Sequence, residues 1–185
     1  RVCCSESKII INKNIIKIVN FNTLKSITSS FSTTEKMPVL FLGHGSPMNA
    51  IEENSFVEGW RNIGKTIPKP NAIICISAHW ETKGTKVTAL QQPKTIHDFY
   101  GFPQALFDVE YPAPGSPELA TEVKNLIKTT DVDLDKMWGF DHGSWSVIKF
   151  LYPEADVPMI ELSLDVYKTP KEHYELAKEL DALRS

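Results

Sequence analysis

Two short apolar runs, each followed by a histidine, are the most regular feature of the hydrophobic pattern. Residues 39–42 are uninterruptedly apolar and lead into Gly43-His44-Gly45, while the mostly apolar run 72–78 leads into His79. A short apolar run that is closed by turn residues is typical of a buried strand ending in a tight loop. Ligands of open α/β sheets bind at the carboxyl ends of the strands. The pattern therefore predicts two strands that deliver two histidines to one edge of a sheet.

The remainder of the pattern alternates between helices and strands. Apolar residues recur at helical spacing over 51–63, and a further helix is predicted over about 144–151. Capping residues beside Pro117 and Pro170 predict two more helix starts. Further strands are predicted at 86–90, 132–137 and 157–164. This alternation is typical of an α/β fold, and we predict a single domain with a mainly parallel central sheet flanked by helices.

Residues 91–117 form a long segment that is rich in proline but also carries aromatic side chains, among them Phe99 and Tyr100. Disordered segments are poor in aromatic residues, and long loops in compact domains are usually either functional or disordered. We therefore predict a folded loop that lines a pocket.

The first 36 residues differ from the others in charge and in pattern. They carry a net charge of +4, whereas residues 37–185 carry −7, and their apolar positions show no clear period. A basic segment that is poor in acids is typical of an organellar targeting peptide, but a single arginine and weak amphipathicity favour an extension outside the fold. We expect the fold to begin at Met37. Because a crossover helix normally returns the chain to the sheet, we also expect the domain to be incomplete at its C-terminus.

Composition narrows the class of protein. The chain has 185 residues, 42% of them hydrophobic and 23% charged, which suits one globular domain. A net charge of −3 gives no reason to expect a nucleic-acid or membrane partner, and no window is apolar enough to span a bilayer. The three cysteines form no disulfide framework, so we expect a reducing, cytoplasmic location. The sequence contains no GxGxxG, P-loop, HExxH or GxSxG motif.

The five histidines differ in the chemistry that their neighbours favour. His44 and His79 follow predicted strands beside small residues, which suits metal ligands, although a glycine turn can also simply contain a histidine. His142 lies next to a carboxylate and between two tryptophans, which suits either a proton-transfer group or a hydrogen-bonded structural residue. His97 could contact a substrate or cap its loop. His173 lies in a predicted helix and is interpreted as structural.

Five motifs in a fixed order support a family resemblance. They are LGHGSPMN at 42–49, SAHW at 77–80, HDFYGFP at 97–103, YPAPGSP at 111–117 and WGFDHGSW at 138–145. Together they resemble the DOPA-dioxygenase type of class III extradiol ring-cleaving dioxygenase, a family related to the catalytic subunit of protocatechuate 4,5-dioxygenase. The resemblance begins at Met37, so residues 37–185 are interpreted as the N-terminal part of such a catalytic domain. A similar histidine-glycine-serine opening also occurs in small tetrapyrrole metal chelatases.

The resemblance implies a mononuclear site for one divalent metal ion, either Fe(II) for ring cleavage or zinc. His44 and His79 fall on the family's two N-terminal metal ligands, and His142 falls on a histidine proposed to act in acid–base and oxygen chemistry. The family completes its site with a histidine in a Gly-Asn-x-x-His-Asn stretch and with another ligand near the C-terminus. Neither occurs within these 185 residues.

The function implied by the resemblance is the opening of a catechol-type, DOPA-like aromatic ring with O₂. Ring cleavage requires a metal with open coordination positions, and a histidine with a near-neutral pKa can move the catechol protons. Aromatic side chains can wall a flat apolar ring, so we predict substrate contacts at His97, Phe99 and Trp145. Two alternatives stay open, namely a non-catalytic scaffold of the same fold and a metal-dependent hydrolase or chelatase.

Overall fold

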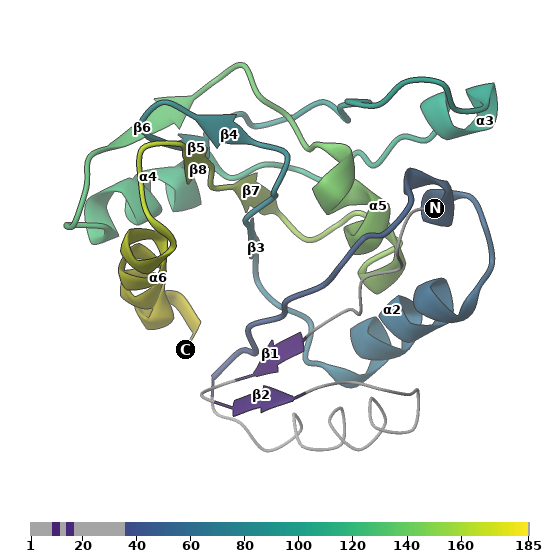
Figure 1. Ribbon diagram of the computed structural model, residues 1–185, viewed down its shortest axis with the longest axis horizontal. Helices are drawn as coiled ribbons and strands as arrows, with labels where there is room; N and C mark the ends of the chain where they lie inside the picture. Colours follow the sequence, from purple (N-terminus) through teal and green to yellow (C-terminus); the bar gives the residue numbers. More distant parts are fainter. Residues whose placement is uncertain (1–8, 12–13, 17–35, 185) are drawn as a thin grey trace.

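The computed structural model describes residues 9–11, 14–16 and 36–184 (Figure 1). Helices and parallel strand pairs make up a mixed α/β architecture, which confirms the predicted fold class. The parallel pairs are β3 (Ile73–Cys75) with β7 (Met159–Glu161), β4 (Glu81–Thr82) with β8 (Leu164–Asp165), and β5 (Thr85–Thr88) with β6 (Val132–Asp135).

The segment that contains β7 joins the strand pairs into one central unit. Leu162 N donates to Cys75 O at 2.9 Å, and Ser163 N donates to Lys86 O at 2.8 Å. Leu162 also forms an antiparallel bridge with Val87 of β5. The β3–β7 pair and the β5–β6 pair therefore meet along this segment.

Alternate residues of β7 face two different helix layers. Met159 belongs to a core cluster with Trp145 of α5 (His142–Leu151), and α5 itself packs against α2 (Ser55–Thr66). Ile160 belongs to a cluster with Val123 of α4 (Pro117–Leu126) and Leu176 of α6 (Pro170–Glu179). Figure 1 shows α4 and α6 to the left of β3 and β7, with α2 and α5 to the right. Full burial of such apolar side chains contributes about 1.5–3 kcal/mol each.

Side-chain caps set the helix starts. Asp141 is the N-cap of α5 and accepts from Ser144 N, so this helix begins two residues earlier than predicted. Asn54 accepts from the amides of Phe56 and Val57, which places the start of α2 after the predicted position 51. Residues before α2 instead form a 3-10 turn, η2 (Pro47–Ala50).

The predicted strand over 39–42 is wrong, because this segment is extended but is not part of a sheet. Leu40 and Leu42 pack against the cluster of α2 and α5, whereas Val39 and Phe41 are 56% and 55% exposed. A strand needs a hydrogen-bonded neighbour along its length. Among the described residues, backbone-to-backbone hydrogen bonds of 37–44 are confined to Met37 N donating to Arg184 O.

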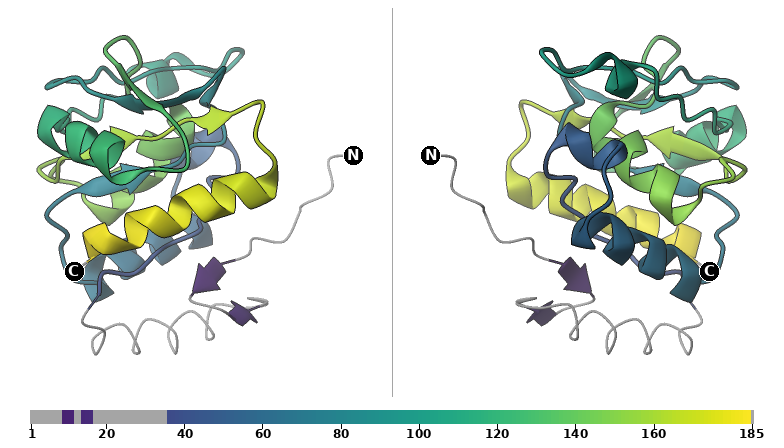
Figure 2. Two further views of the ribbon diagram at one scale, coloured as in Figure 1. Left: turned by 90° about the vertical axis from the view of Figure 1, so that its left-hand side faces the viewer. Right: turned by 90° about the vertical axis from the view of Figure 1, so that its right-hand side faces the viewer.

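The long loop 91–117 is ordered and includes the short helix α3 (Gln104–Phe107). After α6 the chain ends its described part in η3 (Leu180–Arg184), and Figure 2 shows α6 lengthwise beneath the strands. In the first segment, β1 (Ile9–Ile11) pairs antiparallel with β2 (Asn14–Ile16); the rest of 1–35 lies outside the described residues, and its exclusion from the fold stays a prediction. No helix of the described chain is long and apolar enough to cross a membrane.

Candidate metal centre

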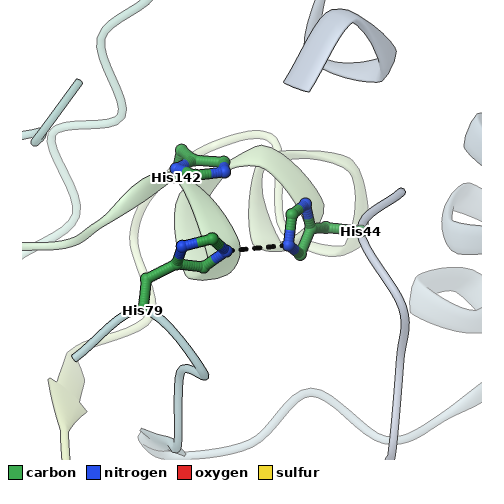
Figure 3. Close-up of side chains that lie close together, drawn as sticks. All are labelled: His44, His79 and His142. Atoms are coloured by element: carbon green, nitrogen blue, oxygen red, sulfur yellow. Dashed lines mark hydrogen bonds between the residues drawn. The ribbon is translucent and has the colours of Figure 1, made fainter. Parts of the chain in front are cut away.

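Three histidines from separate parts of the chain converge at one point (Figure 3). His44 Nε2 and His79 Nε2 lie 3.0 Å apart, and one ring nitrogen from each of His44, His79 and His142 lies within 4.8 Å of the others. His44 comes from the loop after the extended segment, His79 from the loop after β3, and His142 from the first turn of α5. The structure therefore brings together the two predicted ligands and the predicted acid–base residue.

The loop that carries His79 is fixed by small polar neighbours. Ser77 Oγ accepts from His79 N at 3.2 Å and donates to Asp141 Oδ1 at 2.6 Å. Gly143 lies against this loop, and a Cβ at its position would be 2.5 Å from His79 Cδ2 and 2.7 Å from Ser77 Oγ. Only glycine fits there without displacement, because these distances are below van der Waals contact.

The loop that carries His44 is held by a different set of contacts. Gly45 has a φ of 65°, a conformation that glycine adopts without steric cost. Asn49 Nδ2 donates to His44 O at 3.0 Å, and Ser46 Oγ accepts from Met48 N at the start of η2. The η2 turn thus anchors the backbone that presents His44.

Asp98 connects two of the three histidines. Its Oδ1 accepts from the backbone N of His142 at 2.9 Å and lies 2.8 Å from His142 Nδ1. Its Oδ2 lies 3.6 Å from His79 Nδ1. A carboxylate at Nδ1 fixes the ring orientation and leaves Nε2 of His142 as the free nitrogen.

The charges of the centre favour neutral imidazole at His44 and an ionised carboxylate at Asp98. Burial, followed by repulsion from His142 and His79, lowers the pKa of His44 to about 4. Burial alone would raise the pKa of Asp98, but hydrogen bonds from His142 outweigh it and hold that pKa below its usual value. At neutral pH His44 therefore offers an imidazole lone pair near the negative charge of Asp98, the protonation states that metal binding requires of these two groups.

The donor set fits one small divalent cation. Imidazole nitrogens are ligands for both zinc and iron, and two of them on a tetrahedral zinc are about 3.3 Å apart when each bond is about 2.0–2.1 Å. The 3.0 Å between His44 Nε2 and His79 Nε2 is close to this spacing. His44 Nδ1 is buried without a hydrogen-bond partner among the described residues, and His44 Nε2 lies at hydrogen-bond distance from the other proposed ligand, His79.

The predicted substrate contacts lie beside the centre in an aromatic cluster. Phe99 is the nearest, with its ring centroid 5.4 Å from that of His142 at an edge-on angle of 83°. The His97 ring lies 5.6 Å from Trp145, and its Nε2 lies 2.9 Å from Val109 O, so it also fastens its loop. Trp145 is fully buried and donates from Nε1 to Ile96 O. Substrate contact at all three positions stays a prediction.

Sequence reasoning missed the polar residues that support the histidines. Asp98 directly follows His97 in one of the five motifs, which was a usable signal, but its partner His142 is 44 residues away. The carboxylate beside His142 in sequence, Asp141, caps α5 instead of binding the imidazole. Glu161 lies in an apolar strand, and neither spacing nor composition connects it with the histidines.

An α/β fold that brings three imidazoles and a carboxylate together, from loops and from the start of a helix, defines a candidate mononuclear metalloenzyme. The chain belongs to the family described as the catalytic LigB subunit of aromatic ring-opening dioxygenase, whose model matches residues 37–185. This confirms the resemblance drawn from the five motifs.

Named relatives agree with this family. The chain is 54% identical over 153 residues to "4,5-DOPA dioxygenase extradiol" of Escherichia coli (strain K12), covering 82% of this chain and 56% of the relative. It is 41% identical to the Beta vulgaris protein of the same name, covering 78% and 56%. A solved structure of an uncharacterized protein from Escherichia coli K12 matches with a TM-score of 0.67 and 47% identity, covering 80% and 56%. The chain thus spans about half the length of these relatives and is homologous to extradiol ring-cleaving dioxygenases.

Proposed function

We propose that the protein is a metal-dependent extradiol dioxygenase that opens a catechol ring with O₂, and that its substrate is DOPA-like. The observation that carries the proposal is the convergence of His44, His79 and His142 in a chain of this family. The names of the relatives support the substrate class. The cytoplasmic location expected from the cysteines stays a prediction.

The proposed cofactor is one divalent ion, Fe(II) or zinc. It would be held by His44 and His79 together with further ligands that do not belong to these 185 residues. When bound, Fe(II) supplies the open coordination positions and the redox chemistry that ring cleavage with O₂ requires. The two imidazoles come from adjacent loops that are fixed by Ser77 and Asn49, so little ordering remains to be done when the ion binds.

We assign His142 the role of general acid and base. Asp98 holds its Nδ1 at 2.8 Å, which orients the ring so that Nε2 is available to take a proton from a catechol hydroxyl and return it later. Phe99, edge-on to His142, is proposed to contact the flat ring of the substrate. His97 and Trp145 are proposed to form the wall behind Phe99.

Alanine variants test these roles, and they are made in a version of this protein that extends to the full length of its relatives. His44→Ala and His79→Ala should each abolish stoichiometric metal binding, because each removes one imidazole from a catalytic site that usually has only three protein ligands. His142→Ala should keep the metal but slow O₂ uptake with catechols by about 10²–10⁴-fold, the usual contribution of a general acid or base. Metal content by plasma mass spectrometry and O₂ uptake by electrode give the two readings.

His173→Ala is the matched control, because this histidine lies on α6 and contacts Asp165 O. It should keep both metal and turnover. An empty site in His142→Ala with metal retained in His79→Ala would reverse the assignment of ligand and acid–base residue. Wild-type protein that is loaded with Fe(II) but takes up no O₂ with any catechol would refute the activity.

A further inference from the structure

Two carboxyl side chains lie buried behind the histidine cluster. Glu161 on β7 and Asp141 at the start of α5 are both fully buried. Within the described residues, neither takes part in an ion pair. Burying two unpaired negative charges side by side is strongly unfavourable, so one of the two carboxyls is expected to hold a proton.

The hydrogen bonds around the two groups show which oxygen lacks a donor. Glu161 Oε1 accepts from Asp141 N at 3.2 Å and from Ser144 Oγ, and Oε2 accepts from Trp138 Nε1 at 3.2 Å. Asp141 Oδ1 accepts from Ser77 Oγ at 2.6 Å and from Ser144 N at 3.3 Å. Asp141 Oδ2 is buried, and no N–H or hydroxyl group of the described residues donates a hydrogen bond to it. A proton on Glu161 would supply that donor.

We propose that Glu161 is a protonated acid that donates a hydrogen bond to Asp141 Oδ2, and that this acid–carboxylate pair positions the segments carrying His79 and His142. Burial, followed by the negative charge of Asp141, raises the pKa of Glu161 well above its usual value.

Hydrogen bonds from Ser144 Oγ and Asp141 N favour the ionised form of Glu161, but among the described residues no cationic side chain adds to them. Cys75 faces it from β3, and burial raises the pKa of that thiol, so the thiol is neutral. On β5, Thr88 Oγ1 accepts from Glu161 N, while Ser144 on α5 and Trp138 in the preceding loop are uncharged donors. The only charged group in contact with the Glu161 side chain among the described residues is Asp141.

The pair connects β7 with two of the three histidines. Asp141 caps α5, whose first residue is His142, and it accepts from Ser77 Oγ, which in turn accepts from His79 N. Among the described residues, Glu161 forms no hydrogen bond with a histidine, so it acts as a positioning residue. This inference goes beyond the proposed ring opening and is tested without measuring activity.

Infrared spectroscopy of the 185-residue protein tests the proton directly. At pH 6 the wild type should show the carbonyl stretching band of a protonated carboxylic acid, and Glu161→Gln should lack it. Glu122→Gln, at an exposed position on α4, should keep the band. Absence of a protonated-acid band from the wild type, or its persistence in Glu161→Gln, would overturn the proposal.

The pH dependence of unfolding gives a second reading. A raised folded-state pKa means that the neutral acid stabilises the fold fully below the unfolded pKa of about 4.3 and that this stability is lost as pH rises toward the folded pKa. We therefore divide the folding equilibrium constant of the wild type by that of Glu161→Gln at each pH. This ratio should fall about tenfold per pH unit above about pH 5. A ratio that stays constant from pH 5 to pH 7 would overturn the protonated state.

Imidazole signals in ¹H–¹⁵N NMR spectra test the positioning. Glutamine keeps an acceptor for Asp141 N and Ser144 and can donate to Asp141 Oδ2, so the His79 and His142 signals should stay in place in Glu161→Gln. In Glu161→Leu, which cannot form any of these bonds, both should shift. Unchanged His79 and His142 signals in a folded Glu161→Leu variant would refute the positioning role. If Glu161→Leu does not fold, shifted His79 and His142 signals in Glu161→Gln would refute it instead.

Discussion

Asp98 shows how one carboxylate can organise a cluster of imidazoles, because it binds His142 through Oδ1 and approaches His79 through Oδ2. Outer carboxylates of this kind typically account for 10–100-fold in metal affinity. We predict that Asp98→Asn weakens Zn²⁺ binding by about 10–100-fold in a competition titration, since a neutral amide supports the Nδ1 side of His79, a proposed ligand, less strongly than a carboxylate does.

The matched control for this variant is Asp131→Asn, at an exposed position before β6. It removes the same charge at a distance from the histidines and should leave the affinity unchanged. Equal affinities of Asp98→Asn and wild type would show that Asp98 does not organise the cluster.

Gly143 gives a second prediction at the scale of single residues. In Gly143→Ala the new Cβ would overlap His79 Cδ2 and Ser77 Oγ, so the His79 loop must move. We expect Zn²⁺ affinity to fall at least about tenfold and the free energy of unfolding to fall by about 1–3 kcal/mol, as overpacked sites do. Isothermal titration calorimetry and urea denaturation measure the two effects.

Ser146→Ala, on α5 like Gly143, is the control for exchanging one small residue for another on this helix. Ser146 Oγ is buried without a partner among the described residues, so removing it should cost little or even stabilise the fold. A Gly143→Ala variant that binds Zn²⁺ as tightly as Ser146→Ala would contradict the steric account.

At the scale of elements, a single side chain of α6 fastens the turn that follows α4. The Glu179 carboxylate accepts from Thr129 Oγ1 and from the backbone N of Thr129 and Lys128. The hydroxyl of Thr129, followed by the amide of Lys128, lowers the pKa of Glu179. We predict that Glu179→Gln lowers the free energy of unfolding at pH 7 by about 1 kcal/mol.

The pH dependence of this effect follows from the lowered pKa. The stabilisation should be present above the unfolded-state pKa of about 4.3 and be lost as pH falls through the folded-state pKa, so wild type and Glu179→Gln should converge in acid. Glu175→Gln on the same helix removes only an exposed ion pair with Lys178 and should change stability much less than Glu179→Gln does. A difference between wild type and Glu179→Gln that persists at low pH would contradict this assignment.

Elements whose causes are local could be predicted from the sequence, and elements that depend on distant partners could not. The helix start predicted beside Pro170 is confirmed, because both partners of its capping box, Thr169 and Glu172, lie within one turn. The apolar run 39–42 satisfies the pattern of a strand, yet a strand also requires a neighbouring backbone, which no local pattern specifies. The convergence of His44 and His79 was predicted from two strand ends, but only the segment before His79 forms a strand, β3. The contact from Asp98 depends on the path of a long loop.

At the scale of the whole molecule, the first 36 residues are predicted to be dispensable. Lys36 forms an exposed ion pair with Asp181, and ion pairs of this kind contribute little to stability. A chain that begins at Met37 keeps the bonds between Met37 N and Arg184 O and between Arg184 Nε and Met37 O. Its thermal midpoint in scanning fluorimetry should therefore stay within about 4 °C of the full chain.

A chain that begins at Val39 is the matched comparison, because it loses both bonds to Arg184 and should melt at a lower temperature. A large loss of stability on removing residues 1–36 alone would show that this segment packs on the domain.

The parallel pairing of β3 with β7 has a consequence for the newly made chain. Ile73 lies opposite Met159, so the partner of this apolar strand is translated 86 residues later. At about 5–20 residues per second, β3 waits roughly 4 to 17 s on the ribosome before it can be paired. During that interval the Ile73–Cys75 edge is open to chaperones and to strands of neighbouring nascent chains, which makes the speed of translation between these codons a determinant of the yield of folded protein.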